Sequence, residues 1–138
     1  MSLQSDYELA KDPNTPPEVL ELLADDLDPL VRMFVARNPS TPIKTLDKLS
    51  RHSFSIIREY VARNPNTTII ILERLSRDID CYVRATAAKH PNLNLEIMEK
   101  LADDFEPMVR KSLLKNHNAP ERIKNYIIAK SYVTSIRS

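Results

Sequence analysis

The single cysteine and the three histidines are the side chains in this chain best suited to nucleophilic or metal chemistry. Cys81 is expected at the start of a helix, a position that can activate a thiol, but no histidine has a spacing that would make it the partner base. His90 and His117 are expected in two successive loops, and two histidines without a thiol or carboxylate at ligand spacing rarely hold a metal. We therefore interpret Cys81 as a replaceable residue. His90 is interpreted as a helix-ending residue that takes the place of Asn38 and Asn64.

Two clusters of carboxylates could act as acid–base pairs or bind calcium. They consist of Asp25, Asp26 and Asp28 and of Asp103, Asp104 and Glu106. Roughly 30 Å separates the clusters if each helix layer takes ~10 Å, so they cannot act on the same atom. The chain has no glycine, and the turn of an EF-hand calcium loop requires one. We therefore interpret both clusters as helix caps and as charges that complement helix dipoles.

Arginine recurs every 26 residues, each time directly after a β-branched residue. The members of this set are Arg32, Arg58, Arg84 and Arg110. Three of them follow an acidic residue by four positions, which places both side chains on one face of a helix. In the exception, Phe54 stands where the acid would precede Arg58, so Arg58 must find another partner or face solvent. We expect Arg32, Arg84 and Arg110 to be structural and partly buried.

A second set of cations recurs with the same period, at Arg37, Arg63, Lys89 and Lys115. At 100° per residue these cations lie about 200–240° from the apolar stripe of their helices, so we expect them to be exposed. Two interpretations stay open: the cations complement the negative ends of helix dipoles, or they form a linear basic track.

Aromatic residues accompany the first two of these cations. Phe34 and Tyr60 occupy a position that holds Thr86 and Ser112 further along the chain. Aromatics at such a variable position can be binding anchors or core residues, and both interpretations stay open. The candidate binding surface comprises Met33, Phe34, Arg37, Glu59, Tyr60, Arg63, Lys89, Lys111 and Lys115.

The elements that must position these residues follow from the 26-residue period. Proline recurs at residues 13, 39, 65 and 91, and leucine at residues 23, 49, 75 and 101. A period without insertions implies that every unit packs on its neighbours in one geometry. We predict one helical-repeat domain over residues 1–138. Its parts are a partial N-terminal cap (5–12), four full repeats (13–38, 39–64, 65–90 and 91–116) and a degenerate C-terminal repeat or cap (117–138).

Each unit is predicted to contain two helices. The first begins near Thr15-Pro16, where threonine can cap the helix and proline suits its first turn, and Glu18 has the spacing of a capping box. Val19, Leu20, Leu23, Ala24 and Leu27 are expected to form its apolar stripe. The second helix begins near Asp28-Pro29 or Glu106-Pro107 and stops before the next proline. The four leucines of the period are expected to form one buried spine.

The composition narrows the classes of function. Hydrophobic residues make up 42% and charged residues 28% of the 138, a globular balance. Without glycine there is no Gly-rich phosphate loop, and no cofactor is expected. The net charge of +1 gives no general attraction to nucleic acid or to a membrane surface. No apolar run is long enough to cross a membrane, and the cytoplasm is the expected compartment.

Two segments carry a resemblance to a known family. The sequences VRMFVARNPSTPIKTLDKLS (31–50) and IREYVARNPNTTIIILERLS (57–76) closely resemble the leucine-rich repeat variant family, and the likeness covers roughly residues 9–127. The resemblance implies an armadillo- or HEAT-like right-handed α-solenoid in which α-helices alternate with 3₁₀-like helices, without strands. It implies no reaction. The N-terminal cysteine cluster that carries an iron–sulfur centre in some members has no counterpart in this chain.

The leading hypothesis is a non-catalytic scaffold that binds a protein or peptide partner, because stacked repeats present long surfaces. If the basic track functions, an acidic segment is the expected ligand. The alternative is a HEAT-like nucleic-acid-binding module of the kind found in some DNA-repair glycosylases. Near-neutral charge and the absence of tryptophan argue against this alternative. The oligomeric state is left open.

Overall fold

The computed structural model describes residues 4–138, and within them it contains ten α-helices and no strand. The helices are α1 (Asp6–Lys11), α2 (Pro17–Leu23), α3 (Pro29–Arg37), α4 (Ile43–Leu49), α5 (Ser55–Arg63), α6 (Ile69–Leu75), α7 (Cys81–Ala88), α8 (Leu95–Leu101), α9 (Pro107–Leu114) and α10 (Glu121–Arg137). The prediction of an all-α chain is confirmed. The 3₁₀-like helices that the family resemblance implies are not found between residues 4 and 138, where all ten helices are α-helical.

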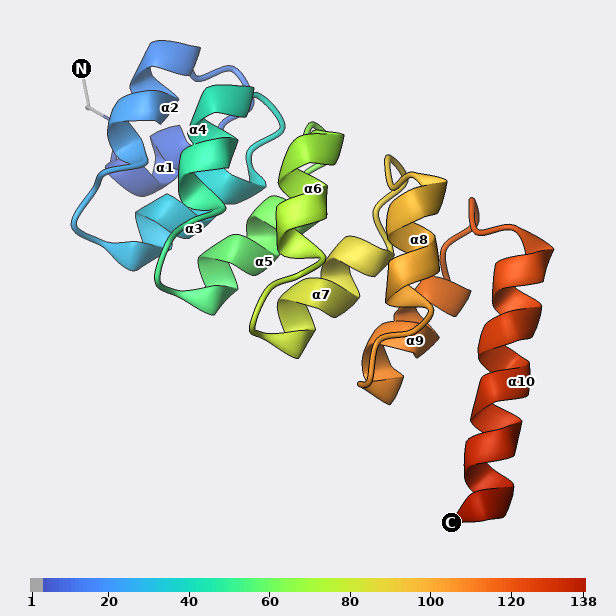
Figure 1. The fold of residues 1–138 in the computed structure, drawn as a ribbon. Helices are drawn as coiled ribbons and strands as arrows, with labels where there is room; N and C mark the ends of the chain where they lie inside the picture. Colours follow the sequence, from blue (N-terminus) through green and yellow to red (C-terminus); the bar gives the residue numbers. More distant parts are fainter. Residues whose placement is uncertain (1–3) are drawn as a thin grey trace.

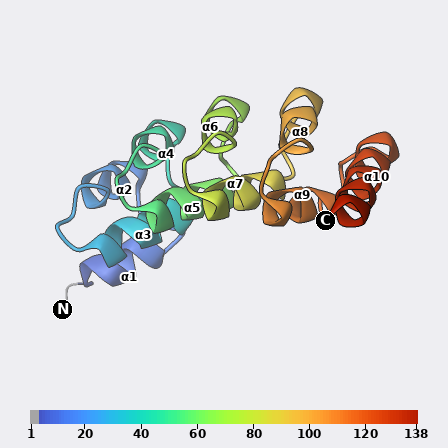
Figure 2. The same cartoon turned by 60° about the horizontal axis from the view of Figure 1, so that its bottom comes forward.

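The helices lie in two rows (Figures 1 and 2). Each odd-numbered helix packs closely on the next one, from α1 to α9. The even-numbered helices form the other row, and α2, α4, α6 and α8 each contact the odd-numbered helix that follows them. Figure 2 shows that the even-numbered row is spread more widely than the odd-numbered one.

The last helix, α10, closes one end of the molecule and differs from the others in length. It runs for 17 residues without a break and extends past α9 (Figure 1). Ile123 and Ile127 are buried on its inner side, whereas Ile128, Tyr132 and Ile136 are exposed. The apolar face that these three residues share is therefore open to solvent.

One apolar cluster runs through the whole stack. Leu23, Leu49, Leu75 and Leu101 all belong to it and are at most 8% exposed, so their predicted burial is confirmed. Leu27 was expected to continue the stripe of the first full unit, but it is 95% exposed. The reason is that α2 ends at Leu23, and the chain turns away from the core before residue 27.

The helix starts predicted near Thr15-Pro16 and Asp28-Pro29 are confirmed, since α2 begins at Pro17 and α3 at Pro29, but the threonine cap and capping box predicted for α2 are wrong. Asp28 caps α3, because its carboxylate accepts from the Leu30 amide at 2.9 Å. Thr15 does not cap α2 and forms no capping box: the N-cap is Pro16, and the Thr15 hydroxyl donates to the Leu9 carbonyl at 2.6 Å. That carbonyl lies near the end of α1 and has no later helical amide to accept from, so it takes the hydroxyl proton.

Buried amide side chains tie each odd-numbered helix to the preceding one. Asn64 Nδ2 donates to the Ala36 carbonyl at 2.8 Å and to the Asn38 carbonyl at 2.9 Å. Asn38 and Asn116 form the same pair of bonds to the carbonyls 28 and 26 residues earlier. His90 occupies the equivalent position, and its Nε2–H donates to the Asn64 carbonyl at 2.7 Å. The C-terminal ends of α1, α3, α5 and α7 are therefore each bound by a side chain from the following unit.

Buried ion pairs form a second set of links between units. Arg84 donates from Nε and Nη2 to the two carboxylate oxygens of Asp104, at 2.9 and 3.2 Å. Arg58 makes the same bidentate pair with Asp78, at 2.8 and 2.9 Å. In both pairs the side chains are at most 13% exposed. The partly buried position predicted for Arg84 is confirmed, and Arg58, for which the sequence left partner or solvent open, is buried in the same way. The carboxylate hydrogen bonds raise the pKa of both guanidinium groups above the ordinary value.

The partners of these arginines differ from those expected from sequence. The acid four residues before Arg84, Asp80, is not its ion-pair partner, because its carboxylate accepts from the Tyr82 amide as the cap of α7. The true partner stands 20 residues later, at the end of the next even-numbered helix. Arg58, for which no partner was evident, has one for the same reason.

The corresponding pair is missing at Arg32. The residue 20 positions later is His52, and the buried Nε of Arg32 has no acceptor among the described residues. His52 Nδ1 accepts from the Phe54 amide at 3.0 Å, as Asp78 Oδ1 accepts from the Asp80 amide at 2.9 Å. Burial first, and then the cations of Arg32 and Arg58, lower the pKa of His52.

Leu75→Ala tests the buried spine. Because Leu75 is fully buried, the variant should lose about 2–5 kcal/mol of unfolding free energy through the cavity it leaves, measured by urea unfolding. Leu27→Ala is the matched control and should change stability by less than about 0.5 kcal/mol. Equal effects of the two substitutions would contradict the packing described here.

His52→Asp tests the missing ion pair. Aspartate would keep the bond to the Phe54 amide and supply a second oxygen to Arg32, so the unfolding free energy at pH 7 should rise by about 1–2 kcal/mol. In the wild type the folded-state pKa of His52 lies below its unfolded value, so this residue's share of stability is lost as pH falls below ~6.5. The variant should lose that component of the pH dependence.

The control is the same substitution at an exposed histidine, His117→Asp, which should leave the unfolding free energy nearly unchanged. If the unfolding free energy of His52→Asp at pH 7 were unchanged or lower, a carboxylate at this position would not stabilise Arg32, and the prediction would be wrong.

Candidate interaction surface

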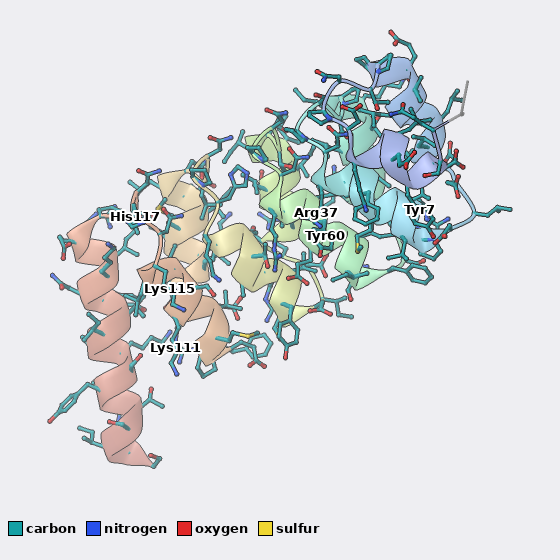
Figure 3. The ribbon with its side chains drawn as sticks, turned by 180° about the vertical axis from the view of Figure 1, so that it is seen from behind. Tyr7, Arg37, Tyr60, Lys111, Lys115 and His117 are labelled. Carbon is teal, nitrogen blue, oxygen red and sulfur yellow. The ribbon has the colours of Figure 1, made fainter. Side chains whose placement is uncertain are left out.

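Five cations stand at the ends of the five odd-numbered helices. This basic track comprises Lys11, Arg37, Arg63, Lys89 and Lys115, each 26 residues after the previous one, and all are exposed. The predicted exposure of the last four is confirmed. Lys11 was not among the candidate residues, although its place in the partial N-terminal unit matches that of Arg37. Figure 3 shows Arg37, Lys111 and Lys115 on one side of the molecule, along the odd-numbered row, with His117 apart from them in the loop before α10.

Helix ends hold the track in place. Lys11, Arg37 and Arg63 are the last residues of α1, α3 and α5, and Lys89 and Lys115 are the C-cap residues of α7 and α9. The four later cations each stand directly before a buried side chain that bonds to the preceding unit. The inward residue therefore fixes the backbone from which its neighbour projects into solvent.

Aromatic rings support the cations at the N-terminal half of the track. Lys11 Nζ lies 4.5 Å from the centre of the Phe34 ring. The guanidinium carbons of Arg37 and Arg63 lie 5.3 and 5.4 Å from the centre of the Tyr60 ring. Both rings are half-buried and pack against the core with one part. Of the two roles that the sequence left open, the structure shows core packing, and a role as binding anchors stays a prediction.

Two shallow hollows lie beside these rings. Lys11, Phe34 and Arg37 line one of about 380 Å³, and Arg37, Tyr60 and Arg63 line the next, of about 280 Å³. Each combines two cations, an aromatic ring and the proline that follows the buried asparagine. Such hollows can hold a negatively charged side chain of an extended ligand.

The C-terminal half of the track has smaller side chains at the aromatic position. Thr86 and Ser112 stand where Phe34 and Tyr60 stand in the earlier helices. A hollow of about 460 Å³ opens between α5, α7 and α9 and is larger than the two beside the rings. Its charged residues are Glu59, Arg63, Lys89, Lys111 and Lys115. Of the candidate residues, only Met33 lines none of these hollows; it is half-buried and packs against the core.

The charge of the track is largely uncompensated. Within residues 4–138, Arg63 alone of the five track cations has a carboxylate within 4.0 Å, that of Glu59 at 2.8 Å. Cations of the even-numbered row are different: Lys44, Lys48, Arg74 and Arg122 are paired with Glu21, Asp25, Asp47 and Glu99. A helix-dipole role accounts for cations at helix ends, but it does not account for the scarcity of acids around the hollows on this face, where Glu59 is the one acid among the lining residues.

The carboxylate clusters are used within the fold. Asp25 pairs with Lys48, and Asp28 caps α3. Asp103 accepts from Lys130 at 2.7 Å and from the Tyr126 hydroxyl, and these two bonds lower its pKa. The predicted capping role is thus correct for Asp28 and wrong for Glu106, whose side chain makes no cap bond although it is the N-cap of α9.

One pair of carboxyl groups, Asp6 and Asp26, has pKa values that are pushed apart. A hydrogen bond with Asp26 raises the pKa of Asp6, whereas the Asp28 amide chiefly lowers that of Asp26. Neither residue lines the hollows described above. Among the described residues, no three His, Cys, Asp or Glu side chains are grouped so that they could hold a metal ion. None of the helices in the described part of the chain has the length and apolarity needed to cross a bilayer.

Alanine substitutions of Arg84 and Arg63 distinguish a structural arginine from a surface arginine. Arg84→Ala should lower the unfolding free energy by about 3 kcal/mol, because the carboxylate of Asp104 stays buried without its partner. Arg63→Ala should cost less than about 1 kcal/mol, since its pair with Glu59 is solvent-exposed. Thermal unfolding at matched pH compares the two, and the opposite order would refute the division between the two arginine sets.

Comparisons with known proteins do not add to this description. No protein-family model matches the chain, and neither the curated proteins nor the solved structures contain a significant match. The resemblance to the leucine-rich repeat variant family therefore stays a prediction that rests on the two quoted segments.

Proposed function

We propose that the protein is a non-catalytic α-solenoid scaffold, built from two-helix repeats, that binds an extended acidic segment of another protein along the basic track. The right-handed solenoid follows from the family resemblance and is supported by the close packing of each odd-numbered helix on the next. The observation that carries the binding function is the row of five cations, of which Arg63 alone has a carboxylate partner within the described residues, beside hollows lined by Phe34 and Tyr60.

The spacing of the track suits an extended peptide. Packed helices lie about 8–10 Å apart, and an extended chain rises about 3.3 Å per residue. Every third residue of a peptide that runs along the odd-numbered row therefore meets a new cation. A segment with an acidic residue at every third position would satisfy several cations at once, and the residues between could contact the rings of Phe34 and Tyr60.

Nucleic-acid binding is the alternative, because the same cations could contact phosphates. Duplex DNA presents a charge about every 1.7 Å along its axis, much more densely than one cation per helix layer. The acids of the even-numbered row and the net charge of +1 further reduce attraction to a polyanion. The observations favour the peptide.

The test is a fluorescence anisotropy titration at physiological salt. The probe is a labelled 12-residue peptide with glutamate at every third position and alanine or serine between, compared with a peptide of the same composition whose glutamates are adjacent. The spaced peptide should bind more tightly. The Arg37→Gln/Lys89→Gln variant should raise its Kd roughly tenfold, which equals ~1.4 kcal/mol.

Lys44→Gln/Lys48→Gln removes the same charge from the even-numbered row, where both lysines are paired, and should change Kd less than about twofold. A labelled 20-base-pair duplex is titrated in parallel. Micromolar duplex binding with a steep salt dependence, together with no binding of either peptide, would replace this proposal by the alternative.

A further inference from the structure

The hollow between α5, α7 and α9 differs from the rest of the track in both shape and charge. Small side chains line it, those of Ala85, Thr86 and Ser112, and two of them, Thr86 and Ser112, stand where the earlier helices carry aromatic rings. Tyr82 and Met108 also line it. A larger hollow therefore lies at this end of the row than beside the rings.

Positive charge is concentrated around this hollow. Four cations line it, and they outnumber its one acid by three. That acid, Glu59, is already bound to Arg63 at 2.8 Å and lies close to the Thr86 hydroxyl. Within residues 4–138, Lys89, Lys111 and Lys115 have no carboxylate within 4.0 Å. Of the four cations that line the hollow, only Arg63 forms an ion pair. Lys111 and Lys115 stand four residues apart on one face of α9, and Figure 3 shows them side by side.

A single carboxylate would leave most of this charge unmet. A phosphomonoester carries about −1.5 to −2 charges at pH 7 and three strong acceptor oxygens. Lysine ammonium groups bind phosphate as point charges that need no fixed orientation, so three of them around one hollow match one phosphoryl group. The two hollows beside the rings offer fewer cations and less room.

We propose that this hollow binds a phosphorylated serine or threonine of the acidic segment. The inference rests on the function proposed above and gives the ligand a direction. Its phosphorylated residue lies at the α7–α9 end, held by Lys89, Lys111 and Lys115. Residues with apolar or planar groups lie towards α1–α5, against Phe34 and Tyr60.

The experiment uses the 12-residue spaced peptide and two derivatives in which phosphoserine replaces the first or the last glutamate. One derivative, the one whose phosphate reaches the hollow, should bind the wild-type protein at least tenfold more tightly than the parent peptide. In Lys111→Gln/Lys115→Gln that gain should disappear, and affinity for the parent peptide should fall by about threefold, because the variant also removes one cation of the track. Circular dichroism melts verify that the variant is folded.

Lys11→Gln/Arg37→Gln is the matched control with the same loss of charge at the other end of the track. It should weaken every peptide and leave the gain from phosphorylation intact. Parent-peptide binding without any gain from phosphate would refute this inference and leave the scaffold proposal standing. A gain that survives in Lys111→Gln/Lys115→Gln would also refute it.

Free phosphoserine, titrated while lysine side-chain NMR signals are recorded, reports on the hollow even if no peptide binds. Shifts confined to signals lost in Lys111→Gln/Lys115→Gln support the phosphate site independently of the scaffold. Absence of those shifts would overturn it. Binding of the 20-base-pair duplex that the same double variant abolishes, with no gain for either phosphopeptide, would assign the hollow to nucleic-acid phosphate instead.

Discussion

Buried side-chain bonds from one unit to the carbonyl groups of the preceding unit set the geometry on which the rest of this molecule depends. The last carbonyl groups of a helix need hydrogen-bond donors from outside the helix. The chain has no glycine that could bring backbone donors to these carbonyls through a left-handed turn. Asn64 supplies two donors to the carbonyls of Ala36 and Asn38, and these bonds are out of contact with water. Because an unsatisfied buried carbonyl costs about 1–3 kcal/mol, the odd-numbered helices are held at one spacing.

The arginine–aspartate pairs repeat this logic on the opposite end of the odd-numbered helices. Arg58 and Arg84 each bridge to an acid of the next unit while also donating to a carbonyl six residues earlier. At the two ends of the arginine series the acid is absent. The residue 20 positions after Arg32 is His52. The residue 20 positions after Arg110 is Lys130, which bonds to Asp103. The Nε atoms of both arginines lack an acceptor in the described residues. The central units are consequently the ones joined by complete ion pairs.

Sequence reasoning succeeded where a property depends on position within one helix. The period of 26 predicted the burial of Leu75, and the angle around the helix predicted the exposure of Arg63. It failed where the outcome depends on contact between units: the partner of Arg84 is not the acid on its own helix, and the Thr15 hydroxyl turns back to the previous helix. The hollow at α7–α9 was also missed, although the change from Phe34 and Tyr60 to Thr86 and Ser112 was visible. A smaller side chain can be recognised as the cause of a cavity only when the distances between the surrounding helices are known.

Residues that hold the helices together and residues that form the exposed track are direct neighbours along the backbone. Asn64 points inward and holds the stack together, and Arg63, immediately before it, points outward and belongs to the track. Neighbouring residues on a helix point about 100° apart, so the two can differ in environment while sharing one rigid backbone. The surface residues can therefore vary from unit to unit, as the aromatic position does, without altering the bonds that fix their spacing. In the proposed function, a fixed spacing with variable side chains gives each helix layer its own ligand chemistry. Aromatic rings then contact the ligand at one end of the track, and lysines bind a dense negative charge at the other.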